Sequence, residues 1–148
     1  MSLPLLHSPA QILRVLLLEL SDGTSPSEDV DWPIYVSAEP DQPDNCITLY
    51  DTTPQDDGRA MFDGETWHHH GIQVRVRATD HPTGWVKAEA LHTSLDEDIY
   101  RNTVTLDAAT YTVSGVYKTL LLILGKDSPR TKRSLFTINC FTSITRES

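Results

Sequence analysis

The chain has 148 residues, a formal net charge of −9 at pH 7 and 39% hydrophobic residues. This length predicts a single domain over residues 1–148 that buries its core without needing disulfides or metals. The acidic charge argues against a general surface for binding nucleic acids.

The first predicted element is a helix near the N-terminus. Ser8 suits the N-cap, Pro9 suits the first helical position, and Gln11 is placed to complete a capping box. Apolar residues recur from there to residue 20, so most of the helix surface is expected to be covered. Residues 15–18 form an apolar run far shorter than the ~20 residues that cross a bilayer.

Strands are predicted next over residues 33–38 and 46–50. Residues 52–70 follow and contain Pro54 and two acid–glycine pairs, Asp57-Gly58 and Asp63-Gly64. These are typical loop residues, so the segment is predicted to be the longest irregular region of the chain. A loop of this length inside a compact domain is usually functional or mobile.

Residues 71–95 form the centre of the predicted fold. Residues 72–79 alternate strictly between apolar and polar side chains, which is typical of a half-buried strand. A helical period then takes over to about residue 98, and its apolar positions define the stripe predicted to face the core: Trp85, Ala88, Leu91, Leu95 and Ile99.

The last third of the chain returns to strand signals. A short strand is predicted over residues 103–106 and a longer one over residues 111–124, with Gly115 marking a bulge or bend. Residues 135–145 form the second strand of a hairpin with a long basic tip. These elements predict an α+β fold with a mixed, mainly antiparallel sheet and two main helices packed on one face.

Charge is distributed unevenly along the sequence. Residues 22–63 hold eleven acidic residues and one base, Arg59, whereas residues 125–148 hold five bases and two acids. The two segments could attract one another within a monomer, or meet in a head-to-tail contact between subunits. They could also be a solvated loop and a solvated turn.

We find no pattern that indicates catalysis. Phosphate-binding and dinucleotide-binding glycine motifs are absent, as is the Gly-x-Ser-x-Gly nucleophile motif. His68, His69 and His70 are consecutive, and consecutive residues of an extended chain point to opposite faces, so they are not expected to bind one metal ion. The sequence therefore predicts no enzyme, no metal and no cofactor. Cys46 and Cys140, without a signal peptide, are expected to be reduced and buried.

Arg75 and Arg77 lie on the polar face of the central strand, about 7 Å apart by strand geometry. They could pair with acids on a neighbouring strand of the same subunit. Alternatively, they could contact another subunit or partner, because arginine is enriched at interfaces.

Four segments resemble a known family through their order and spacing. They are the capped N-terminal helix, the Pro43-Asp44-Asn45 turn into the strand of residues 46–51, the Gln73–Arg77 strand before a helix, and the Gly125–Arg133 turn before residues 136–139. Together they resemble the tail terminator (minor capsid) proteins of long-tailed bacteriophages. The polar segment at residues 52–70 departs from that family, in which we expect a tighter glycine turn.

This resemblance implies a tail-terminator-like subunit that forms a homo-hexameric ring at the tail–neck junction of the virion, after assembly in the bacterial cytoplasm. The ring would cap the tail tube, end its polymerisation and join it to a head-completion or connector protein. Genomic DNA would pass through the lumen without specific binding. The candidate subunit or partner interface comprises Gln73, Arg75, Arg77, Asp127, Arg130, Lys132 and Arg133.

Three alternatives remain open at this point. The protein could be another neck or head-completion protein of similar size, which only its position in a particle would distinguish. It could be a small metal-dependent hydrolase that uses the histidine cluster, which metal analysis would reveal. It could also be a cytosolic adaptor domain.

Overall fold

The computed structural model describes residues 4–20, 32–40, 44–59, 66–118, 122–126 and 133–147. Within these ranges the helices are α1 (Pro9–Glu19) and α2 (His81–Glu97). The strands in chain order are β1 (Ile34–Val36), β2 (Cys46–Arg59), β3 (Thr66–Ala78), β4 (Asn102–Leu106), β5 (Ala109–Lys118), β6 (Leu122–Lys126) and β7 (Ser134–Arg146).

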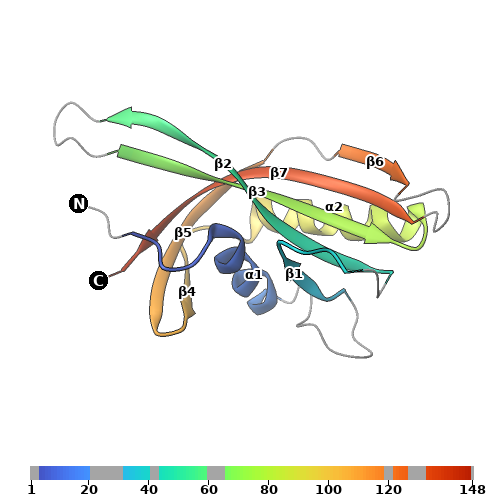
Figure 1. Ribbon diagram of the computed structural model, residues 1–148, viewed down its shortest axis with the longest axis horizontal. Helices are drawn as coiled ribbons and strands as arrows, with labels where there is room; N and C mark the ends of the chain where they lie inside the picture. Colours follow the sequence, from blue (N-terminus) through green and yellow to red (C-terminus); the bar gives the residue numbers. More distant parts are fainter. Residues whose placement is uncertain are drawn as a thin grey trace.

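The strands form one twisted sheet in the order β1-β2-β3-β7-β5-β4, and β6 also pairs with β7 (Figure 1). β1 runs parallel to β2, and the other pairs are antiparallel. β5 and β6 follow one another along the same edge of β7, because Lys118 lies opposite Cys140 and Leu122 lies opposite Thr137. The prediction of a mixed, mainly antiparallel sheet is confirmed.

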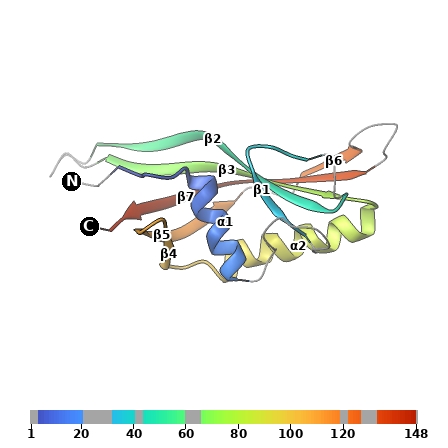
Figure 2. The same cartoon turned by 60° about the horizontal axis from the view of Figure 1, so that its bottom comes forward.

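Both helices lie on the same side of the sheet (Figure 2). α1 packs against β1, β2, β3 and β4, and α2 packs against β3, β5 and β7. The prediction of an α+β fold with two helices on one face is therefore confirmed.

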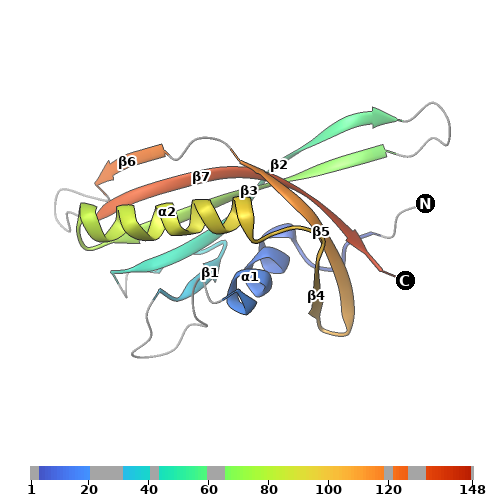
Figure 3. The same cartoon turned by 180° about the vertical axis from the view of Figure 1, so that it is seen from behind.

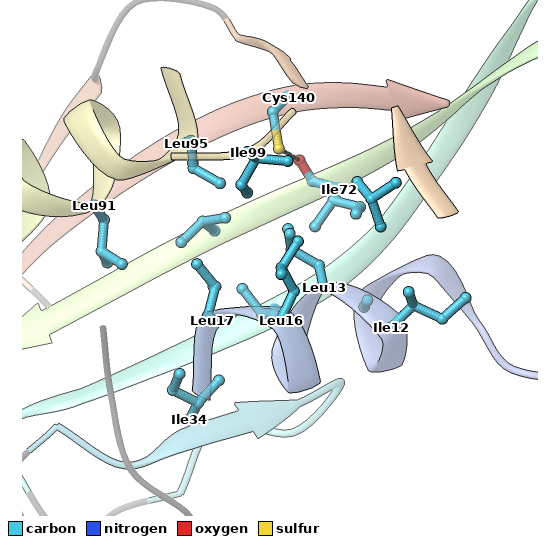
Figure 4. Packing of buried hydrophobic residues seen from close by; sticks show 14 of the residues in the cluster. Ile12, Leu13, Leu16, Leu17, Ile34, Ile72, Leu91, Leu95, Ile99 and Cys140 are labelled. Atoms are coloured by element: carbon cyan, nitrogen blue, oxygen red, sulfur yellow. Dashed lines mark hydrogen bonds between the residues drawn. The ribbon is translucent and has the colours of Figure 1, made fainter. Parts of the chain in front are cut away.

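The core lies between β3 and the two helices (Figure 4). Ile72, Val74 and Val76 of β3 point to the helices and are fully buried, as their alternation predicts. Fully burying one such side chain stabilises the fold by roughly 1.5–3 kcal/mol. The helices contribute the following buried residues: Ile12, Leu13, Leu16 and Leu17 from α1, and Ala88, Leu91 and Leu95 from α2.

Side chains fix where the helices begin. The Ser8 hydroxyl accepts from the Gln11 backbone N–H at 3.3 Å, and the Gln11 side chain accepts from the Ser8 N–H at 2.8 Å, so the predicted capping box is confirmed. Asp80 caps α2 by accepting from the Thr83 N–H at 2.9 Å, and this bond lowers the pKa of the Asp80 carboxyl. Arg14 joins α1 to β1 by donating to the Ile34 carbonyl at 2.9 Å.

The predicted core stripe of α2 is wrong at Trp85, whose exposed fraction is 41%. Gly84 is buried in its place, against Phe136 and Ala78. The stripe runs through Gly84 and Ala88 because only a small residue fits where the helix approaches the sheet most closely. Trp85 lies at the side of the contact, with its ring stacked on His81 at 6.5 Å.

The prediction of an irregular segment at residues 52–70 is also wrong over residues 52–59 and 66–70, while its residues 60–65 lie outside the described residues. β2 extends to Arg59 and β3 begins at Thr66, which is its partner in the pairing. β3 pairs with β7 only from His70, opposite Thr142, onward. Residues 53–59 and 66–69, which we call the arm, therefore form a two-stranded ribbon that projects past the sheet (Figure 1).

Loop-forming residues fit in the arm because its pairing is irregular. β2 gains an extra residue between Thr52 and Gln55 and again between Asp56 and Arg59. β1 pairs only with residues 47–49, so among the described strands this part of β2 pairs with β3 alone. Proline is tolerated at bulges and on edge strands, which explains why Pro54 does not end the strand.

The predicted irregularity at Gly115 is confirmed as a bulge. Val113 lies opposite Ile144 and Val116 lies opposite Thr142, so β5 holds one extra residue here. The Thr142 hydroxyl donates to the Gly115 carbonyl at 2.7 Å and satisfies a group that the bulge removes from regular pairing.

Candidate interaction surface

The face of the sheet opposite the helices carries the polar residues of β3. Gln73, Arg75 and Arg77 point to this side because Ile72, Val74 and Val76 point to the core. Strand pairing places each of them in a row with one residue of β2 and one of β7: Tyr50–Gln73–Asn139, Thr48–Arg75–Thr137 and Cys46–Arg77–Leu135. We call these three rows the polar face.

Arg77 is buried although it points away from the helices. Its exposed fraction is 3%, because the segment after β1 folds over it. The Arg77 Nη1 donates to the Glu39 carboxylate at 3.0 Å, and the Nε donates to the Asp44 carbonyl at 3.3 Å. Arg77 therefore holds the connection between β1 and β2 against the sheet. Its partners belong to the same subunit, as one alternative supposed, but they lie in this connection and not on a neighbouring strand.

Arg75 and Gln73 remain partly accessible. The Arg75 side chain is 31% exposed, and its Nε lies 3.4 Å from the same Glu39 carboxylate. That contact is an ion pair by distance but lacks the alignment of a hydrogen bond, so both atoms are left without a hydrogen-bond partner. Gln73 donates from Nε2 to the Asn139 side-chain oxygen at 3.3 Å.

Arg133, at the start of β7, lies at the same end of the polar face. It is 7% exposed, and its Nη1 donates to the Asp44 carboxylate at 3.3 Å. Asp44 therefore lies between Arg133 and Arg77, and the structure brings these two predicted residues together. The other predicted residues of the basic turn, Asp127, Arg130 and Lys132, lie outside the described residues.

No local sequence pattern pointed to the two carboxylates that pair with these arginines. Glu39 and Asp44 belong to the acidic segment but lie 38 and 33 residues before Arg77. The available signal was the Pro43-Asp44-Asn45 turn, which enters the strand that pairs with β3. Asn45 also accepts from the Thr79 N–H at 2.9 Å, so this turn ties the start of β2 to the end of β3.

The acidic segment is thus divided between two ends of the molecule. Glu39 and Asp44 pair with arginines near the basic turn, while Asp51, Asp56 and Asp57 lie along β2 toward the arm. The arm and strand β6 lie at opposite ends of the molecule (Figure 3). β3 has 13 residues, so its two ends are about 40 Å apart. Charges at that separation are screened from one another, because the Debye length is about 8 Å.

Both cysteines are free and buried, as expected from the sequence. Burial raises the pKa of the Cys46 thiol, although nearby Arg77 opposes the change, and burial raises the pKa of the Cys140 thiol to about 12. Cys46 lies on the polar face and Cys140 on the core face, where its thiol lies 3.4 Å from the Ile72 carbonyl oxygen. The sheet lies between them, so the two are not placed to form a disulfide.

The described residues offer little for metal chemistry. Among them, no group of three His, Cys, Asp or Glu side chains is placed to hold a metal ion. The Nδ1 of His69 lies 3.3 Å from the Ser143 hydroxyl, at the point where the arm leaves β7. In the same part of the chain, neither helix is long and apolar enough to cross a membrane.

A family model described as "Bacteriophage tail terminator protein" matches residues 17–129. The matched range includes β1 to β6, both arginines of β3 and the whole arm. No curated protein matches the chain.

Proposed function

The chain belongs to the bacteriophage tail terminator family, and from this premise we propose that it is a structural subunit of the tail–neck junction. Several copies close into a ring on the end of the tail tube, which ends tube polymerisation. The ring then joins the tail to a head-completion or connector protein. The observation that carries this proposal is the family match over residues 17–129. We also propose that the helices and the sheet of this chain pack as they do in tail terminator proteins.

The separation of charge supports ring formation. The arm and residues 60–65, which join its strands in sequence, hold four acids and one base, the β6–β7 end is basic in sequence, and about 40 Å of β3 lies between the two ends. Opposite charges that cannot meet within one subunit can meet between two. A contact between one end of a subunit and the other end of the next is heterologous, and such contacts close into rings when the rotation permits. The copy number that we propose is six.

The accessible part of the polar face is the proposed place for further contacts. Gln73 and Arg75, with Tyr50 and Asn139 of the same rows, are the partly exposed members, and we propose that Asp127, Arg130 and Lys132 extend the surface along the basic turn. Arg77 and Arg133 stabilise this surface from within the subunit, because their guanidinium groups pair with Glu39 and Asp44.

We propose no catalytic role and no cofactor. The partners are the tail tube protein on one side of the ring and a head-completion or connector protein on the other. Genomic DNA crosses the lumen without specific binding, which the net charge of −9 supports because specific grip on DNA needs clustered Lys and Arg.

A tube-elongation experiment tests this function. Purified tail tube protein is polymerised with and without the protein, and tube lengths are measured by electron microscopy. We expect shorter tubes that carry a ring at one end. The proposal would be contradicted if tubes grown with the protein were as long as tubes grown without it and never carried it. Attachment to tailless heads instead would favour a head-completion role.

A charge reversal tests the polar face separately. Arg75→Glu should weaken assembly while the melting temperature changes little, because Arg75 is partly exposed and its ion pair is poorly aligned. Thr93→Glu, at an exposed position of α2 on the opposite side of the sheet, is the matched control. If Arg75→Glu assembles like the control, the polar face is not an interface.

A further inference from the structure

Arg75 is held on the polar face by a contact that exchanges easily. Its Nε lies 3.4 Å from the Glu39 carboxylate without forming a hydrogen bond, whereas Glu39 keeps a hydrogen bond of 3.0 Å to Arg77. A partner carboxylate can therefore take Arg75 while the buried Arg77–Glu39 pair stays intact. The Arg75 side chain is 31% exposed, so such a partner can reach it.

Two buried hydroxyl groups lie on either side of Arg75. Thr48 of β2 and Thr137 of β7 are its neighbours in the same row, and their exposed fractions are 0% and 1%. Neither hydroxyl has a hydrogen-bond partner among the described residues. A buried polar group without a partner costs free energy, so this row is incomplete in the isolated subunit. A carboxylate that draws Arg75 away from the sheet also brings an acceptor toward these two donors.

The C-terminal end of α2 has the complementary charge. Glu97 and Asp98 are exposed there, and neither side chain has a hydrogen bond or ion pair with a described residue. The last turn of α2 holds no base. Because the C-terminus of a helix carries partial negative charge, both acids lie where negative charge is unfavourable. A cation supplied by another molecule would offset this unfavourable charge.

Tyr100 adds an aromatic side chain to this end of α2. It is 73% exposed, which is the highest value for a large hydrophobic residue in the described chain. Its backbone N–H donates to the Asn102 side chain at 2.7 Å, and the Arg101 guanidinium lies 5.5 Å from its ring centroid. Tyrosine and arginine are enriched among the residues that contribute most to binding at interfaces. We call Glu97, Asp98 and Tyr100 the acidic corner.

The acidic corner and the polar face cannot meet within one subunit. α2 lies on one side of the sheet (Figure 2), and the polar face is the opposite side. A contact between them therefore joins two copies through different surfaces. Such a contact is heterologous, and it uses both surfaces of every copy only when the copies form a closed ring.

We propose that the acidic corner of one copy docks on the polar face of a second copy. The Glu97 and Asp98 carboxylates bind Arg75 and accept from the hydroxyls beside it, while Tyr100 packs on Tyr50 in the next row. This inference rests on the proposed ring and names one contact that forms it. Each copy offers its polar face to one neighbour and its acidic corner to the other.

A charge exchange tests the contact. Arg75→Glu and the double variant Glu97→Lys, Asp98→Lys should each weaken self-association by about tenfold or more, because like charges then face one another. The double variant should not lower the melting temperature, because bases are favourable at the C-terminal end of a helix. Sedimentation equilibrium measures association, and the same variants are compared on tail tubes if the native chain assembles only there.

The contact should be restored in two ways. A chain that carries all three substitutions should associate again, because its polar face is acidic and its corner is basic. An equal mixture of the two weakened variants should also associate, because each supplies the surface that the other needs. Glu89→Lys, about 12 Å earlier on α2, is the matched control, and it should neither weaken association nor rescue Arg75→Glu.

The possible outcomes separate this inference from the proposed function. A triple variant that associates no better than Arg75→Glu would overturn the inference. Association of the native chain that neither reversal weakens would also overturn it and leave the ring standing. If Arg75→Glu associates with the native chain more tightly than either does with itself, two polar faces meet and the inference is wrong. A protein that stays monomeric and does not bind tail tubes would overturn both.

Discussion

Gly84 sets the distance between helix α2 and the sheet. A Cβ atom at this position would lie 2.4 Å from Cε2 of Phe136 and 3.0 Å from the Cβ of Ala78. Phe136 is fully buried, so its ring has no free space into which to move. The glycine is therefore a packing requirement, and it displaces Trp85 to the exposed side of the helix.

Gly84→Ala should destabilise the protein. Overpacking at a buried contact typically costs about 1–3 kcal/mol, which outweighs the gain of up to about 1 kcal/mol in helix propensity. Urea denaturation measures the change in the free energy of unfolding. Gly115→Ala is the matched control, because a Cβ there meets nothing within 4 Å, and it should change stability by less than about 0.5 kcal/mol. Equal stability of the two variants would contradict the packing argument.

Arg75 and Arg77 have different roles although they share one face of β3. Arg77→Met removes the buried partner of the Glu39 carboxylate, so it should lower the free energy of unfolding by about 3–5 kcal/mol. The Arg75 side chain is 31% exposed, so Arg75→Met should lower the free energy of unfolding by less than about 1 kcal/mol. Thermal and urea unfolding of the two variants provide the comparison. Similar losses at both positions would show that Arg77 does not hold the β1–β2 connection.

At the scale of the elements, the arm is the main departure from expectation. Bulges in β2 break the period of two that identifies a strand, and Pro54 is normally a sign of a loop. Neither feature excludes a strand without a second neighbour. Residues 53–59 are extended because they pair with β3. That pairing joins two segments of the chain, so the local pattern of either segment does not predict it.

The arm should be dispensable for folding and necessary for assembly. Thr52 lies opposite Gly71, so residues 53–70 can be replaced by Asn-Gly, a dipeptide suited to a two-residue hairpin. The shortened chain should unfold cooperatively within a few degrees of the full chain, because the core residues are kept. Its oligomers should disappear in sedimentation velocity. A shortened chain that still assembles would assign the contact to another surface.

Local signals predicted most of the other elements. The capping box at Ser8, the alternation from Ile72 to Ala78 and the irregularity at Gly115 each have a cause within a few residues, and the structure confirms them. The partners of Arg77 could not be predicted in the same way. Glu39 is 38 residues away, and its contact depends on how the connection after β1 folds over the polar face.

At the scale of the whole molecule, the net charge and its distribution predict opposite effects of salt. A net charge of −9 makes copies repel one another, so salt would strengthen a symmetric contact between like surfaces. A contact between an acidic arm and a basic end is attractive, and salt would weaken it. The direction of the effect therefore reports which surfaces meet.

We expect association to weaken as NaCl rises from about 0.05 M to about 0.5 M, where the Debye length falls to a few ångströms. Sedimentation equilibrium gives the association constant at each concentration. A variant with Asp56→Lys and Asp57→Lys should lose this dependence, because both positions lie on the arm strand of β2. Association that strengthens with salt in the native chain would contradict a head-to-tail contact.

The position of β7 has a consequence for the order of events during synthesis. β7 lies at the centre of the sheet, with β3 on one side and β5 and β6 on the other, yet residues 134–146 leave the ribosome after all of these strands. Until then, the edges of β3 and β5 stay open, and open edges invite pairing with other chains. The nascent protein is therefore most prone to aggregation just before β7 emerges, and insertion of this one strand completes both halves of the sheet.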